Sequence, residues 1–76
     1  MQMQIATYTN KDDGLEGRIY RNYGSAFPYT VELWDMDANE CALTRIVDNL
    51  DRAQSFARAF CGEGYSVGVC CDLEKA

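Results

Sequence analysis

The stretch from residue 29 to residue 62 constrains the fold of this chain most, because three local signals follow one another in it. Alternating side chains over residues 29–36 predict a strand, and Asp-Ala-Asn-Glu at 37–40 predicts a tight turn. Residues 41–47 predict a returning strand, and a helical pattern then runs from residue 50 to about residue 61. The rest of the chain is expected to attach to this strand, turn, strand and helix.

The predicted helix has a start signal, a stop signal and an apolar face. Asn49 is a good N-cap, Asp51 places a negative charge in the first turn, and Gly62 can end the helix. The apolar positions recur at helical spacing: Ala53, Phe56, Ala57, Phe60 and Cys61. We expect Phe56 and Phe60 to be buried, which would stabilise the fold by roughly 1.5–3 kcal/mol each. Either Phe to Ala change is therefore expected to unfold much of the protein.

Shorter patterns flank this stretch. Further strands are expected at 3–9, 18–23 and 65–71, with a loop at 10–17, a connector at 24–28 and a loose tail at 72–76. The predicted fold is a single α+β domain over residues 1–76, a small and mainly antiparallel sheet with one helix packed on one face, in the order β-β-β-β-α-β. One helix of about 12 residues spans only about 18 Å, so the other face must meet water or a partner.

The direction of Trp34 decides what lies on that uncovered face. If Val31 and Leu33 pack under the helix, Trp34 and Glu32 lie on the uncovered side of the same strand. If Trp34 is the core residue, the strand faces the opposite way. The sequence does not decide which face of the returning strand is buried. One face holds Cys41, Leu43 and Val47, and the other holds Ala42, Thr44 and Ile46.

Charge limits the class of partner. Twelve acidic residues against seven basic ones give a net charge of -5, which opposes binding to phosphate backbones and to anionic lipid. We therefore expect no direct nucleic-acid ligand and no membrane. A protein with a basic surface is one candidate partner, and acidity that serves only solubility is the other explanation.

The N-terminal residues lack the basic start and apolar run of a signal peptide, so a cytoplasmic protein is expected. Its four cysteines should then remain reduced thiols. They are Cys41, Cys61, Cys70 and Cys71. Their spacing does not match the paired ligands of structural zinc sites, and no histidine is present to complete a mixed set.

No motif indicates catalysis, a cofactor or a metal. Asp35, Asp37 and Asn39 match the opening of a calcium-binding EF-hand loop. The glycine required at the sixth position is Glu40, and the glutamate required at the twelfth is Ile46, so a hairpin turn is expected instead. Without histidine, triads that use an imidazole base are excluded, and no glycine-rich phosphate-binding loop occurs. We expect a protein that is not an enzyme.

Aromatic residues outside the helix are more numerous than the covered face of a small sheet can bury. They are Tyr8, Tyr20, Tyr23, Phe27, Tyr29, Trp34 and Tyr65. Exposed Tyr and Trp are favoured at protein interfaces. They are equally able to cover sheet edges or to fill a second, shallow core.

Size, acidity, the lack of catalytic groups and the sheet-plus-one-helix pattern together resemble the small phage and mobile-element proteins that block host defences, among them anti-CRISPR inhibitors. The resemblance is one of type over the whole chain. It implies stoichiometric binding, in the host cytoplasm, to a basic, nucleic-acid-binding surface of a nucleoprotein or nuclease, with acidic side chains standing in for the phosphates of nucleic acid.

Two patches of the sequence are candidates for such binding. The first is Glu32, Trp34, Asp35, Asp37 and Glu40, and the second is Asp12, Asp13 and Glu16. The leading hypothesis is a non-enzymatic inhibitor that occupies a basic nucleic-acid-binding site on a CRISPR effector complex. The alternative is a structural or regulatory module that forms a homodimer or larger homo-oligomer through the uncovered aromatic sheet face.

Overall fold

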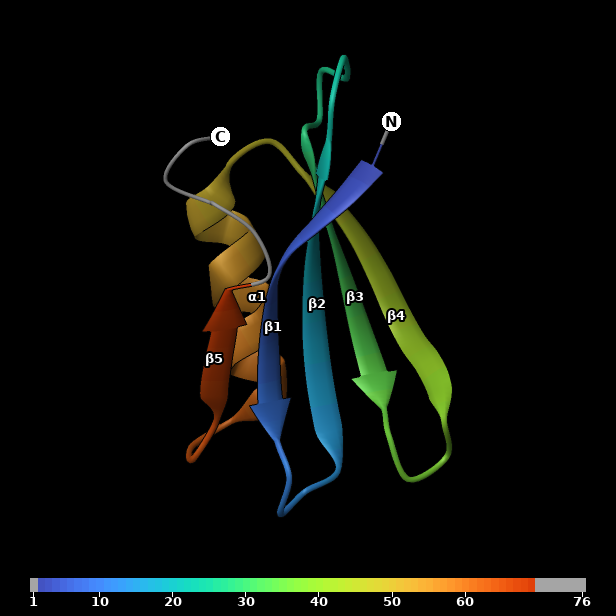
Figure 1. Cartoon of the computed structure of the whole chain (residues 1–76), viewed down its shortest axis with the longest axis vertical. Helices are drawn as coiled ribbons and strands as arrows, with labels where there is room; N and C mark the ends of the chain where they lie inside the picture. The colour runs from blue at the N-terminus through green and yellow to red at the C-terminus, as the bar shows by residue number, and fades with distance from the viewer. Residues whose placement is uncertain (1, 70–76) are drawn as a thin grey trace.

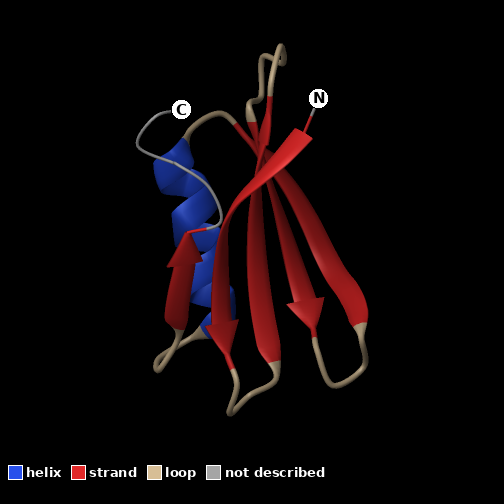
Figure 2. Cartoon of the chain, in the orientation of Figure 1, coloured by secondary structure: helices blue, strands red, loops and turns tan. Residues whose placement is uncertain are grey.

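The computed structural model describes residues 2–69, which form a five-stranded antiparallel sheet with one helix against it (Figure 1, Figure 2). The elements in chain order are β1 (Gln2–Asn10), β2 (Leu15–Asn22), β3 (Tyr29–Asp35), β4 (Glu40–Val47), α1 (Leu50–Cys61) and β5 (Ser66–Val69). The strands lie in the order β4-β3-β2-β1-β5. The predicted α+β class and the order β-β-β-β-α-β are confirmed. The predicted tail at 72–76 lies outside the described residues, as do Cys70 and Cys71.

The predicted ends of the helix are confirmed by their cap geometry. Asn49 has extended backbone angles, and its side-chain Oδ1 accepts a hydrogen bond of 2.8 Å from the backbone N–H of Arg52. Gly62 follows the helix with φ of 73°, in the left-handed region that glycine tolerates. Its N–H donates to the carbonyl of Arg58 at 2.9 Å. Both ends are therefore fixed by local chemistry.

The face by which α1 packs is made of small side chains. Ala53, Ala57 and Cys61, each one turn apart, are fully buried against the sheet. Phe60 packs partly against this core, whereas Phe56 is 38% exposed. The prediction that Phe56 is buried is therefore wrong, because the line of closest contact passes through the small residues and leaves Phe56 on the flank of the helix.

The close approach of helix and sheet depends on Gly17. A Cβ placed on Gly17 would lie 2.9 Å from the Cβ of Ala57 and 3.1 Å from its backbone Cα. Gly17 belongs to β2, which begins at Leu15, so the predicted loop over 10–17 is too long. Turn-forming residue types suggested a loop here, but the absence of a side chain at Gly17 is what allows the helix to lie so near.

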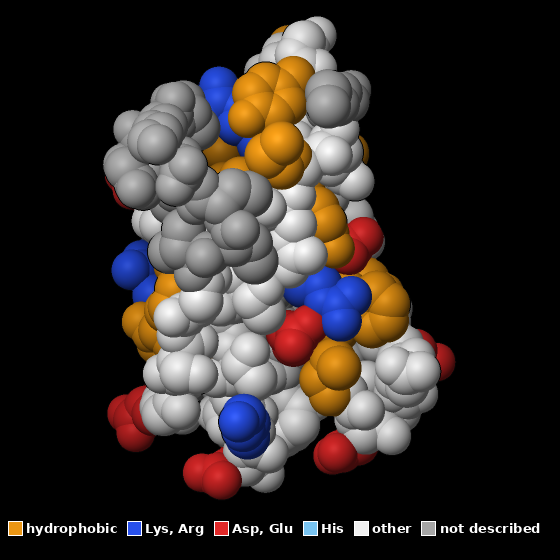
Figure 3. Space-filling view, in the orientation of Figure 1, with side chains coloured by type: hydrophobic (Ala, Val, Ile, Leu, Met, Phe, Trp, Pro, Cys, Tyr) orange, Lys and Arg blue, Asp and Glu red, His pale blue; other side chains and the backbone are white. Residues whose placement is uncertain are grey.

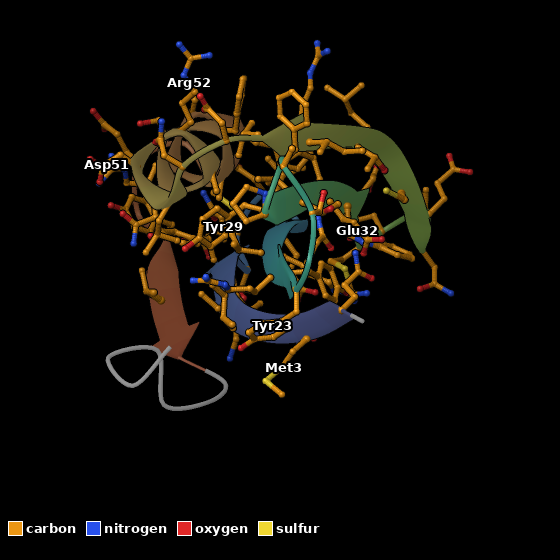
Figure 4. All side chains as sticks on the ribbon, turned by 90° about the horizontal axis from the view of Figure 1, so that it is seen from above. Met3, Tyr23, Tyr29, Glu32, Asp51 and Arg52 are labelled. Atoms are coloured by element: carbon orange, nitrogen blue, oxygen red, sulfur yellow. The ribbon has the colours of Figure 1, made fainter. Side chains whose placement is uncertain are left out.

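Strand register resolves the direction of Trp34. Ile19 lies opposite Val31 and Gly17 opposite Leu33, and Val31 and Leu33 are buried on the helix-covered face. Glu32, which lies between these two residues, and Trp34, which follows Leu33, therefore lie on the other face, called the open face below. Figure 4 shows the same division, with Tyr29 on the side of β3 toward the helix and Glu32 on the opposite side.

Bulges alter the alternation in the first and fourth strands. In β1 the register shifts between Gln4 and Ala6, so Ile5 and Ala6 are both buried. In β4 a shift beside Ala42 places Cys41 opposite Trp34 on the open face, whereas Leu43 lies opposite Leu33 on the covered face. The predicted grouping of Cys41 with Leu43 is therefore wrong, because the extra residue reverses the order of the faces.

Replacing Phe56 by alanine is expected to lower the free energy of unfolding by less than about 1 kcal/mol, because the side chain is already partly in water. The matched change of Phe60 to alanine should cost about 2 kcal/mol or more, since that ring packs on the core. Urea unfolding of the two variants measures the difference. Equal losses would contradict this placement of the two rings.

Candidate functional site

Five side chains of β2 and β3 form one group on the open face, called the open-face cluster below. They are Glu16, Arg18, Tyr20, Glu32 and Trp34. Antiparallel pairing places Arg18 opposite Glu32 and Glu16 opposite Trp34. Residues directly opposite in such a pair have neighbouring Cβ atoms on the same face. The cluster thus follows from the register of two strands.

Arg18 is the centre of the open-face cluster. Its Nε makes an ion pair with Oε2 of Glu16. Its guanidinium carbon lies 4.3 Å from the ring centroid of Trp34, a cation–π distance. Trp34 in turn donates from Nε1 to Oε1 of Glu32 at 3.1 Å. One cation and one indole therefore engage both glutamates.

Titration properties agree with this mutual engagement. Burial lowers the pKa of Arg18, but the hydrogen bond and charge of Glu16 outweigh it, so the pKa lies above its ordinary value. The pKa of Tyr20 is also raised, first by burial and then by a hydrogen bond to Glu32 and the charge of that carboxylate. The cluster is thus a self-satisfied polar surface, and its two carboxylates are poorly available to a partner.

A second group of acidic residues lies where the two hairpins turn, at the lower end of the molecule in Figure 1. The N–H of Met36 in the β3–β4 turn donates to the carbonyl of Gly14 in the β1–β2 turn at 2.7 Å. A Cβ on Gly14 would lie 2.6 Å from Oδ2 of Asp37, so the Asp37 carboxylate lies directly against the first turn. The turns that carry Asp12 and Asp37 are therefore neighbours in space.

Asn10 joins the turn after α1 to the same end. Its buried side-chain amide donates to the carbonyls of Cys61 at 2.7 Å and Glu63 at 3.0 Å, and to Oδ2 of Asp13 at 3.2 Å. Glu63 thus lies near the hairpin turns, and we call Asp12, Asp13, Asp37 and Glu63 the acidic end. Figure 3 shows acidic side chains gathered there, around a basic side chain. Lys11, in the first turn, offsets part of the charge.

The carboxylates of the acidic end are far less engaged than those of the open-face cluster. Within residues 2–69 the only ion pair is that of Arg18 with Glu16. Asp12, Asp13, Asp37 and Glu63 are all exposed. Negative charge that is exposed and unpaired is available to attract a cationic surface.

Six of the eight predicted binding residues lie in these two regions. Glu16, Glu32 and Trp34 lie together in the open-face cluster, whereas Asp12, Asp13 and Asp37 lie at the acidic end. Two others are separate. Asp35 caps the β3–β4 turn, where its Oδ1 accepts from the N–H groups of Asp37 and Ala38, and Glu40 is exposed at the start of β4. The fold thus joins parts of the two predicted patches and separates others.

Sequence reasoning missed Arg18, Asn10 and Glu63. The pairing of Arg18 with Glu16, two residues away on one strand face, was a signal that could have been found. Asn10 and Glu63 had no such signal, because their hydrogen bond joins segments 53 residues apart.

A shallow pocket of about 260 Å³ lies between the hairpin turns, lined by Lys11, Glu16, Met36 and Asp37 among others. In the described part of the chain, no group of three or more His, Cys, Asp or Glu side chains is placed to hold a metal ion. Burial raises the pKa of the Cys61 thiol, whose Sγ lies 3.4 Å from the carbonyl oxygen of Tyr8. Cys61 is therefore a packing residue.

Across residues 2–69, no helix has both the length and the apolar character needed to cross a membrane. Comparisons of the chain with protein-family models, with curated proteins and with solved structures gave no match.

Proposed function

We propose that this protein is a non-enzymatic inhibitor whose acidic end occupies a basic, nucleic-acid-binding surface of a host defence nucleoprotein. The observation that carries the proposal is the meeting of the two hairpin turns, which gathers exposed carboxylates from distant parts of the chain. A net charge of -5 adds a long-range attraction toward such a surface.

The acidic end supports this role better than the open-face cluster does. Glu16 and Glu32 already interact with Arg18 and Trp34. A partner would therefore have to displace those contacts, or bind carboxylates whose negative charge is already partly neutralised by Arg18. The carboxylates of Asp12 and Asp37 need no such exchange. We therefore place the main contact at the hairpin turns, with Trp34 as a neighbouring aromatic surface.

The class of partner rests on the resemblance in size, charge and architecture to anti-CRISPR proteins. Self-association through the open face is the less favoured alternative, because pairing that face with a copy of itself would bury the charged groups of the cluster. Such burial removes water from ionised groups without supplying opposite charge. The open face is therefore expected to stay in contact with water.

Reversing two charges at the acidic end should abolish most of the inhibition. We expect the wild-type protein to prevent DNA binding by one member of a panel of purified CRISPR effector complexes, measured by fluorescence anisotropy. Asp12→Lys with Asp37→Lys should weaken this effect about tenfold or more, and added salt should weaken the wild-type effect too.

The matched control reverses two exposed charges at the other end of the molecule, where α1 begins, with Asp48→Lys and Asp51→Lys. This variant should inhibit nearly as well as the wild type, and circular dichroism should show that both variants fold. Equal inhibition by the two double variants would remove the acidic end from the proposal. Failure of the wild type with every complex in the panel would reject a CRISPR effector as the partner.

A further inference from the structure

The strand β4 forms one outer edge of the sheet and has no neighbour on its far side among the described residues. It is eight residues long, whereas β5, at the other edge, has four described residues. An edge strand presents a row of backbone N–H and C=O groups that can pair with another strand. β4 is therefore the longer of the two available templates for strand addition.

β4 is also uncovered on both faces. Every residue from Glu40 to Ile46 is exposed, and only Val47 is buried. The reason is that α1 packs mainly against β2 and β3 and only slightly against β4. The exposed fraction is 43% for Leu43 and 63% for Ile46, and the two lie on opposite faces, because Leu43 is opposite Leu33 and Ile46 opposite Thr30. Apolar surface of this kind gains stability when another strand covers it.

The bulge in β4 places the two charged residues of this strand, Glu40 and Arg45, on the same face of the sheet. Glu40 lies opposite Asp35 and Arg45 opposite Val31, so both belong to the helix-covered side of the sheet. In a regular strand, residues five apart would point to opposite faces. The extra residue beside Ala42 therefore brings a negative and a positive side chain onto the same face, near the two ends of one edge strand.

This arrangement is complementary to itself when the strand is reversed. We propose that two copies of the protein pair through antiparallel β4 strands, with Glu40 of each copy opposite Arg45 of the other. A two-fold axis perpendicular to the sheet then produces the ion pair twice and places both helices on the same face of one continuous sheet. In the same register Cys41 lies opposite Thr44 of the second copy, both on the open face, and Ala42 lies opposite Leu43.

The choice of a second copy over a strand from another protein rests on this charge complementarity. Opposite charges directly across an antiparallel pair are favourable and like charges unfavourable. A symmetric pairing shifted by one place toward either end would bring side chains of opposite faces together or leave both charges unmatched. The surface is separate from the acidic end, so the proposal is independent of the inhibitory function.

The test is a charge swap followed by sedimentation velocity under reducing conditions, from micromolar to near-millimolar protein. We expect the wild type to dimerise as concentration rises. Glu40→Arg and Arg45→Glu should each raise the dimer dissociation constant about tenfold, because each places like charges together at two symmetric positions. The double variant Glu40→Arg with Arg45→Glu should restore dimerisation.

The control variants, Glu63→Arg and Arg58→Glu, reverse exposed charges that lie off β4 and should leave the dissociation constant unchanged. Circular dichroism should show that all variants fold. A wild type that stays monomeric over the whole range would overturn the proposal. So would a dimer that neither single reversal weakens, or one that the double variant does not restore, since another surface or register would then hold it.

Discussion

Replacing Gly17 by valine is expected to remove a large part of the free energy of unfolding, about 3 kcal/mol or more. The first added carbon would meet the Ala57 side chain at 2.9 Å and its backbone at 3.1 Å, so the helix as a whole must move away from β2. That movement would also loosen the contacts of Ala53 and Cys61. A domain of this size has a total of only about 4–11 kcal/mol, so partial unfolding at room temperature is expected. Urea unfolding followed by circular dichroism measures the loss.

The matched control is Gly68→Val in β5. Gly68 also lies within a strand, but a Cβ there has nothing nearer than the carbonyl oxygen of Thr7 at 4.0 Å. This variant should change stability by less than about 0.5 kcal/mol. If both valine variants lose the same amount, the close helix–sheet contact at Gly17 is not what limits the packing.

Replacing Ile19 by alanine is expected to cost about 3–4 kcal/mol, because the side chain is fully buried in the middle of the sheet. Ile19 lies between Ala6 of β1 and Val31 of β3, beneath the helix. Its loss would leave a cavity that small neighbours cannot fill. The measurement is again urea unfolding, with the midpoint and slope compared with those of the wild type.

The same substitution at Ile46 provides the control, since that side chain is 63% exposed at the sheet edge. Ile46→Ala should cost less than about 1 kcal/mol at low micromolar protein. A loss at Ile46 as large as that at Ile19 would mean that β4 is covered in solution even at low concentration.

The candidate site was only partly predictable. The sequence indicated acidic turns and an aromatic residue on an uncovered strand face. The two acidic patches appeared separate, because the distance between Gly14 and Met36 along the chain says nothing of the hydrogen bond between them. The sequence also did not show that Glu16 and Glu32 already have partners within the protein. Their contacts depend on Arg18 lying beside Trp34, and that position depends on how β2 and β3 align.

The sequence by itself determined the order of the elements and the ends of the helix, because the signals for these are local. Asn49 and Gly62 bound the helix through hydrogen bonds within a few residues. The alternation in β3 separated Val31 and Leu33 from Trp34, but only the structure showed which of the two faces the helix covers. Such patterns depend on neighbours along the chain. They can therefore be recognised without knowledge of the fold.

Only the tertiary structure decided which surfaces meet. It placed Phe56 at the flank of the helix because Ala57 lies directly against Gly17, and the bulge in β4 reversed the face of Cys41. It also brought Asp12 and Asp37 to one end of the molecule. Each of these results depends on distances between segments far apart in the chain, where packing and strand register outweigh local preference.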